Sequence, residues 1–168
     1  MSWVADLIPN GRRNRPGIKI SPRYITMHDT GNAAVGAGAR SHGVFLREHS
    51  APVTPGQIRS WHVTVDDTDV VQHLLFDEMG YHAGHSDGNT SSIGIEICQN
   101  PDSDRAVAED SAAKLVADLM KQYDISIENV VPHSRWADTR CPVLLRTRWH
   151  MFIVKVAEYA ELTIPEEV

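Results

Sequence analysis

A nearly continuous apolar run, SSIGIEICQN at residues 91–100, limits most strongly what this chain can fold into. Such a run is typical of a strand buried in a sheet, and its one charged interruption is Glu96. From Ala106 to Tyr123, apolar residues recur at helical spacing, which predicts an amphipathic helix with one buried face. A buried strand followed by a helix that covers it indicates an α/β domain.

Further strands and helices are predicted on both sides of this pair. Residues 60–75, SWHVTVDDTDVVQHLL, form two alternating strands around DDTD, which predicts a hairpin. The hairpin argues against an all-parallel sheet, so we expect a single α/β domain with a central mixed sheet flanked by helices. The other predicted segments are strands at 23–29 and 127–134, helices at 37–49 and 147–162, a Pro-rich loop at 50–57 and a long surface loop at 76–90.

Composition narrows the possible partners. The chain has 168 residues, enough for one domain with its own core, and 42% of them are hydrophobic. Its net charge is −6 and no basic stripe alternates with aromatic residues, which argues against nucleic acid. The apolar runs fall short of the roughly 20 residues of a membrane helix, so we expect no membrane partner. A monomer is expected.

The cysteines and the N-terminus bear on where the protein is made. A chain of this size with only two cysteines, Cys98 and Cys141, is expected to use them as a buried thiol and as a ligand or nucleophile. The opening residues lack the order of a secretory signal. We therefore expect synthesis in the cytoplasm.

Four residues could carry chemistry, and each has an alternative explanation. Glu96 is a possible general base, or else it faces solvent or pairs with an arginine. His28, just before the turn, is a ligand or a turn residue. His133 and Cys141 lie eight residues apart without a zinc-finger spacing. Together with His28 they would offer two imidazoles and a thiolate, a set that suits zinc.

Five motifs in this order carry a family resemblance: ITMHDTG, SWHVTVDD, VVQHLLFDEMGYHAG, SSIGIEIC and VVPHSRWADTRCP. Together they resemble the zinc-dependent N-acetylmuramoyl-L-alanine amidases of phage endolysins and Bacillus autolysins. The broader superfamily, amidase-2, includes the peptidoglycan recognition proteins. The similarity extends from about Tyr24 to Pro142.

The resemblance implies a fold, a reaction and a site. It implies an amidase-2 or peptidoglycan recognition protein-like sheet, and hydrolysis of the amide between N-acetylmuramic acid and L-alanine in peptidoglycan. His28, His133 and Cys141 match the ligands of one Zn²⁺ per chain, and Glu96 matches the residue assigned to proton transfer. The enzyme would act on the cell wall after release by phage lysis or by a non-Sec route.

Departures from the family pattern concern the substrate contacts. Relatives often carry a lysine two residues before the third ligand, where it could stabilise the developing oxyanion; this chain has Thr139 there, followed by Arg140. Either Arg140 takes this role at the substrate, Thr139 gives a weaker hydrogen bond, or the zinc carries the charge by itself. Relatives also often show WHAG where this chain has YHAG, so Tyr81 is expected to line the groove differently. His82, in a glycine-flanked loop of a motif that the family shares, is expected to contact substrate. His62 and His73 are expected to be structural or to orient ligands. The remaining histidines are expected at the surface: His42, His49, His85 and His150.

The domain organisation follows from the same match. We expect residues 1–168 to form one catalytic amidase domain, with a motif core at about 24–142, a covering helix at about 146–161 and no separate wall-binding domain. Two rival functions remain at this point. One is a peptidoglycan-binding module without zinc. Non-catalytic recognition proteins of this kind lack the cysteine ligand, so the presence of Cys141 argues against this alternative. The other is a thiol hydrolase with Cys141 as nucleophile and His133 as base.

Overall fold

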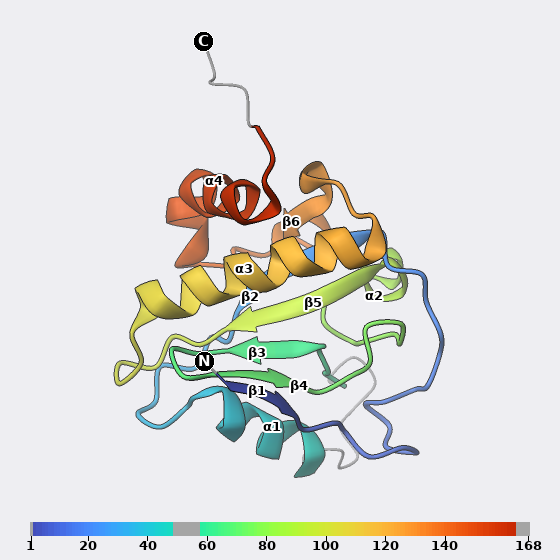
Figure 1. The fold of residues 1–168 in the computed structure, drawn as a ribbon. Helices are drawn as coiled ribbons and strands as arrows, with labels where there is room; N and C mark the ends of the chain where they lie inside the picture. Colours follow the sequence, from blue (N-terminus) through green and yellow to red (C-terminus); the bar gives the residue numbers. More distant parts are fainter. Residues whose placement is uncertain (1, 49–57, 164–168) are drawn as a thin grey trace.

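A six-stranded sheet with helices on both faces forms the fold (Figure 1). The computed structural model describes residues 2–48 and 58–163. The strands are β1 (Ser2–Ala5), β2 (Tyr24–Asp29), β3 (Val63–Val65), β4 (Asp69–Gln72), β5 (Ser92–Ile97) and β6 (Val130–Pro132). The α-helices are α1 (Ala39–Glu48), α2 (Ser86–Ser91), α3 (Arg105–Tyr123) and α4 (Trp149–Ala160). Short 3-10 helices are η1 (Ile127–Asn129), η2 (His133–Arg135) and η3 (Leu145–Arg148).

The sheet is mixed, as the sequence predicted. Its strand order is β1-β4-β3-β5-β2-β6. The hairpin strands β3 and β4 pair antiparallel, whereas β2 pairs parallel with both β5 and β6. The edge strand β1 was not predicted, because four residues are too few for a recognisable alternation. The expected α/β class with a central mixed sheet is confirmed.

One face of the sheet is apolar and lies under α3. Ile25 and Met27 of β2 are fully buried in a core to which Ile93, Ile95 and Ile97 of β5 also belong. Asp104 caps the first turn of α3 by accepting hydrogen bonds from two backbone N–H groups. The helix α4 packs beside α3 on this face (Figure 1), so the larger hydrophobic core is closed by two helices.

The opposite face carries polar side chains. Because side chains alternate along a strand, the residues between the core isoleucines point away from α3. They include Thr26, His28 and Glu96, together with Gly94, where no side chain fills the space. The helix α1 packs over β3 and β4 on this side of the sheet (Figure 1). The neighbouring strands β5 and β2 therefore present polar groups on the same side of the sheet as α1.

The segment at 76–90 differs from the prediction of a surface loop. It contains the short helix α2, and Met79, His82 and Ala83 are buried within it. A lack of periodicity in the sequence does not mean exposure here, because His82 packs onto the polar face of the sheet against His28 and Gly94. The predicted helix at 37–49 is observed as α1, and the predicted loop at 50–57 lies outside the described residues. None of the helices in the described ranges has the length and apolar character needed to cross a membrane.

Candidate metal centre

Three neighbouring strands bring the predicted site residues together. In the register of β2 and β5, His28 is paired with Glu96. In the register of β2 and β6, Met27 is paired with Pro132, so His133 follows beside His28. All three strands run parallel, and their carboxyl ends meet at one edge, where α/β proteins commonly place their sites.

The two histidines and the cysteine form a compact donor set. His28 Nδ1 lies 3.1 Å from His133 Nδ1 and 3.7 Å from Cys141 Sγ. All three donor atoms lie within 4.8 Å of one another. Tetrahedral zinc with ordinary bond lengths would separate two nitrogens by about 3.3 Å and a nitrogen from a sulfur by about 3.6 Å. The donor types and spacings therefore fit zinc.

Asp29 positions the segment that carries Cys141. This buried carboxylate, directly after His28, accepts hydrogen bonds from the backbone N–H groups of Leu144 at 2.6 Å and Leu145 at 3.3 Å. Its other oxygen pairs with Arg105 of α3. Asp29 was predicted only as the last residue of the strand at 23–29, although its position next to a predicted ligand was the available signal. The carboxylate links β2, α3 and the chain after the cysteine.

Thr139 also acts on the backbone of the cysteine. Its hydroxyl accepts a hydrogen bond from Cys141 N at 3.2 Å, while Ser134 N donates to Cys141 O at 3.3 Å. Because the hydroxyl has this backbone partner, it stabilises the turn in front of the cysteine. Arg140 is exposed and lines a cavity next to the site. Tyr81 is half-buried, and its backbone N–H donates to Ser60 Oγ.

His82 lies behind His28. We expected this histidine to contact substrate, but its ring is buried and both of its nitrogens have protein partners. His82 Nδ1 lies 3.1 Å from His28 Nε2, and His82 Nε2 lies 3.3 Å from the carbonyl oxygen of Ser92. The carbonyl can only accept, so His82 carries its proton on Nε2 and accepts from His28 Nε2–H. This tautomer leaves the lone pair of His28 Nδ1 facing the other donors.

Burial controls the protonation of the three donors. It lowers the pKa of His28 well below its ordinary value, with the nearby histidines adding to the effect, and it lowers the pKa of His133. Both imidazoles are therefore neutral near pH 7, the form that binds metals. Burial raises the pKa of the Cys141 thiol to about 12. The thiol keeps its proton unless a cation stabilises the thiolate, the opposite of an activated cysteine nucleophile.

Glu96 has the environment of a perturbed acid. Its Oε2 atom is buried without a hydrogen-bond partner, and no lysine or arginine of residues 2–48 and 58–163 forms an ion pair with it. Burial raises the pKa of Glu96 to about 8, and the negative charge of Asp29 adds to this effect, while Arg59 opposes it. An unpaired carboxyl with a raised pKa beside a cluster of metal-type donors is typical of a functional site.

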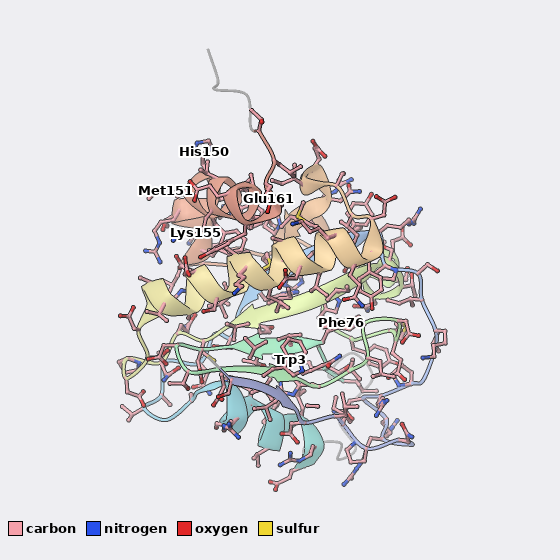
Figure 2. All side chains as sticks on the ribbon, in the orientation of Figure 1. Trp3, Phe76, His150, Met151, Lys155 and Glu161 are labelled. Atoms are coloured by element: carbon pink, nitrogen blue, oxygen red, sulfur yellow. The ribbon has the colours of Figure 1, made fainter. Side chains whose placement is uncertain are left out.

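The other histidines divide between core and surface. His62 is fully buried, with its Nε2 2.8 Å from Glu78 O and its Nδ1 accepting from Gly94 N. The prediction that His42 lies at the surface was wrong. His42 belongs to α1 and is one of its buried residues, and its Nδ1 lies near the Gly38 carbonyl oxygen. His85 is exposed, as is His150, which projects from α4 (Figure 2). His49 lies outside the described residues.

The fold and site define an α/β protein with a two-histidine, one-cysteine metal-type centre at the carboxyl edge of a mixed sheet. The chain belongs to the N-acetylmuramoyl-L-alanine amidase family, whose model matches residues 18–143. The expected membership of the amidase-2 superfamily is confirmed.

Individual relatives of known sequence or structure support this family assignment. The chain is 46% identical to the N-acetylmuramoyl-L-alanine amidase XlyA of Bacillus subtilis over 89% of its own length and 49% of XlyA. It is 44% identical to CwlH of the same organism, over 88% of this chain and 58% of CwlH. It therefore spans about half the length of these relatives. The structure of the catalytic domain of XlyA superimposes with a TM-score of 0.85 at 44% identity, over 93% of this chain and 99% of that domain.

Proposed function

We propose that this chain hydrolyses the amide bond between N-acetylmuramic acid and L-alanine in peptidoglycan. The observation that carries the proposal is the placement of Glu96, with an unpartnered buried oxygen, on the strand next to His28 in a two-histidine, one-cysteine donor set. The names of the relatives XlyA and CwlH support the same activity. In this proposal the domain acts as a monomer on the cell wall, after release from the cell that makes it.

The metal in this proposal is one Zn²⁺ per chain, held by His28, His133 and Cys141. The donor spacings and the neutral state of both imidazoles support it. Bound zinc supplies Lewis-acid polarisation of the amide carbonyl and lowers the pKa of water, which are the two effects that amide hydrolysis needs near neutral pH. A divalent ion also explains how a thiol with a raised pKa becomes a thiolate ligand.

Glu96 moves the proton in this mechanism. Its carboxylate accepts a proton from the attacking water as a C–O bond forms at the lactyl carbonyl carbon. The same carboxyl then donates that proton to the nitrogen of L-alanine as the C–N bond breaks. A raised pKa suits this double role, because the carboxylate is a stronger base toward water than an ordinary glutamate and, once protonated, it holds the proton near neutral pH until the leaving nitrogen takes it. The products are a free muramic carboxylate and a stem peptide with a free N-terminus.

The expected substrate contacts are kept in part. Tyr81 and Arg140 are proposed to contact the substrate, since the first is half-buried and the second is exposed beside Cys141. Thr139 is proposed to act indirectly, through its hydrogen bond to the cysteine backbone. His82 is proposed to orient His28, because both of its ring nitrogens already have protein partners.

The test is digestion of purified peptidoglycan with and without a zinc chelator, followed by mass spectrometry. We expect free stem peptides with new L-alanine N-termini beside intact glycan chains, and their loss when the chelator is present. Restoration by added Zn²⁺ is the matching control. Products that form despite the chelator but are lost after thiol alkylation would indicate a thiol hydrolase. Pull-down with the wall without any covalent product would indicate a binding module, and either result would overturn the proposal.

A further inference from the structure

A cavity lined by arginines adjoins the metal-type centre. It has a volume of about 740 Å³ and is lined by residues 134–140 together with Arg146. Its first lining residue, Ser134, follows His133 in the chain, and its last loop residue, Arg140, precedes Cys141. Two lining residues of the cavity are therefore the chain neighbours of the metal-type donors His133 and Cys141.

Three arginines of this cavity form no ion pair with any residue that the structure describes. Arg135, Arg140 and Arg146 are exposed, and none of them forms an ion pair with a carboxylate in the described ranges 2–48 and 58–163. Five of the nine other arginines of this acidic chain do form such an ion pair: Arg15, Arg40, Arg47, Arg105 and Arg148.

The charge inside the cavity favours an anion. The only acidic residue among those lining it is Asp138, so three positive charges face one negative charge. Like charges that line one cavity repel one another, and a bound anion reduces this repulsion. Guanidinium groups also bind carboxylates and phosphates through paired hydrogen bonds.

The loop that presents Arg135 and Arg140 is anchored to the sheet, while Arg146 belongs to η3. Trp136 Nε1–H donates to Thr26 Oγ1 at 2.9 Å, and the Trp136 ring packs edge-on against Tyr24. A Cβ added at Gly88 would lie 2.8 Å from Trp136 Cγ, so the indole fits closely against α2. The guanidinium of Arg135 lies 5.8 Å from the centre of the same ring. The wall is thus fixed before a ligand arrives, which reduces the entropic cost of binding.

We propose that this cavity binds a carboxylate of the stem peptide, on the leaving-group side of the scissile bond. The inference rests on the proposed amidase function. In the substrate, the lactyl carboxyl of muramic acid is consumed in the scissile amide and the sugars are N-acetylated, so the glycan near the bond is neutral. The nearest negative charge belongs to the glutamate that follows L-alanine. Two extended residues span roughly 7 Å, which is within the reach of a cavity that starts beside the ligands.

The test compares two disaccharide tetrapeptides, in which the α-carboxyl of the D-glutamate is either free or amidated. We expect the unmodified protein to cleave the free form with a KM about two- to fivefold lower, the scale of one exposed ion pair. We expect Arg146→Gln to remove this difference by raising KM for the free form alone. Higher salt should reduce the preference in the same way, because the charges are exposed.

Arg13→Gln is the control, since Arg13 is exposed, lies outside the cavity lining and changes the net charge equally. It should keep the preference of the unmodified protein. Equal KM values for the two substrates in the unmodified protein, or an unchanged preference in Arg146→Gln, would overturn the peptide assignment. Loss of binding to a wall glycerol-phosphate polymer in Arg146→Gln, with both peptides cleaved as before, would overturn it in favour of phosphate. Failure of the unmodified protein to cleave either peptide would instead refute the amidase proposal itself.

Discussion

His28 is held from behind by His82: the Nε2 atom of His28 lies 3.1 Å from His82 Nδ1, while its Nδ1 atom faces His133 and Cys141. The Ser92 carbonyl fixes the proton of His82, and His82 in turn fixes that of His28. Gly94 makes room for this arrangement, since a Cβ there would lie 2.6 Å from His82 Cγ. The orientation of a metal-type donor therefore depends on a residue with no access to substrate.

Replacement of His82 should weaken zinc binding. We expect His82→Ala to lower zinc affinity by about 10- to 100-fold, the usual effect of removing a hydrogen-bond partner of a ligating histidine. His82→Asn should lose less, because its side-chain oxygen can accept from His28 Nε2–H near the former Nδ1 position. The measurement is competition with a chromophoric chelator, with His73→Gln as a control that removes a buried histidine elsewhere. Equal affinity in all three variants would show that His82 does not orient His28.

The two cysteines should behave oppositely toward zinc. Cys141→Ser removes the thiolate donor, and we expect a loss of zinc affinity of at least about 100-fold together with loss of activity. Cys98→Ala removes a buried thiol that packs with Ala39 and Val71, so zinc affinity should stay the same and only stability should fall slightly. Metal content after dialysis, measured for both variants, checks this. Retention of one zinc per chain in Cys141→Ser would remove this cysteine from the ligand set.

Much of the fold and site could be predicted because periodicity and motif order are local features of the sequence. The strand at 91–100, the hairpin and both long helices follow from side-chain alternation or helical spacing. The family resemblance, not the spacing, brought His28, His133 and Cys141 together; taken alone, His133 and Cys141 are eight residues apart without a recognisable zinc spacing.

The remaining features depend on tertiary contacts that no local pattern records. Burial of His42 and His82 depends on which segments cover the polar face of the sheet. The role of Asp29 depends on backbone N–H groups more than 100 residues away. The arginine-lined cavity depends on which arginines find an acidic partner across the fold, and sequence alone does not give these pairings.

Glu96→Gln should separate catalysis from stability. We expect turnover to fall by about 100-fold or more while zinc binding is kept, because the amide cannot accept the proton of water. In the zinc-free protein the variant should also gain stability at alkaline pH. The pKa of Glu96 is raised from its ordinary value of 4.5 to about 8, so its contribution to stability is complete below pH 4.5 and is lost as the pH rises toward 8. The glutamine side chain of the variant does not titrate, so the variant does not lose stability in this way as the pH rises.

Thermal unfolding of the zinc-free proteins at pH 5 and pH 9 measures this effect. The difference in melting temperature between Glu96→Gln and the unmodified protein should be more positive at pH 9. Full activity of the variant would refute the assignment of Glu96 as the proton carrier. A pH-independent difference in melting temperature would show that the carboxyl is better solvated than its buried, unpartnered oxygen indicates.

His73 should make the fold sensitive to acid. Its buried ring lies between Thr64 Oγ1, 2.8 Å from Nε2, and the backbone of Asp6, and burial lowers its pKa to about 3. A lowered pKa in the folded state means that the stabilising contribution is complete above pH 6.5 and is lost as the pH falls toward 3. Between pH 6.5 and 4.5 this loss amounts to about 2–3 kcal/mol. His73→Gln should reduce the loss, whereas His150→Gln, at an exposed position, should not. The measurement is the free energy of unfolding in urea at pH 6.5 and pH 4.5 for the unmodified protein, His73→Gln and His150→Gln. If all three lose the same free energy between these pH values, the acid sensitivity belongs to other buried histidines.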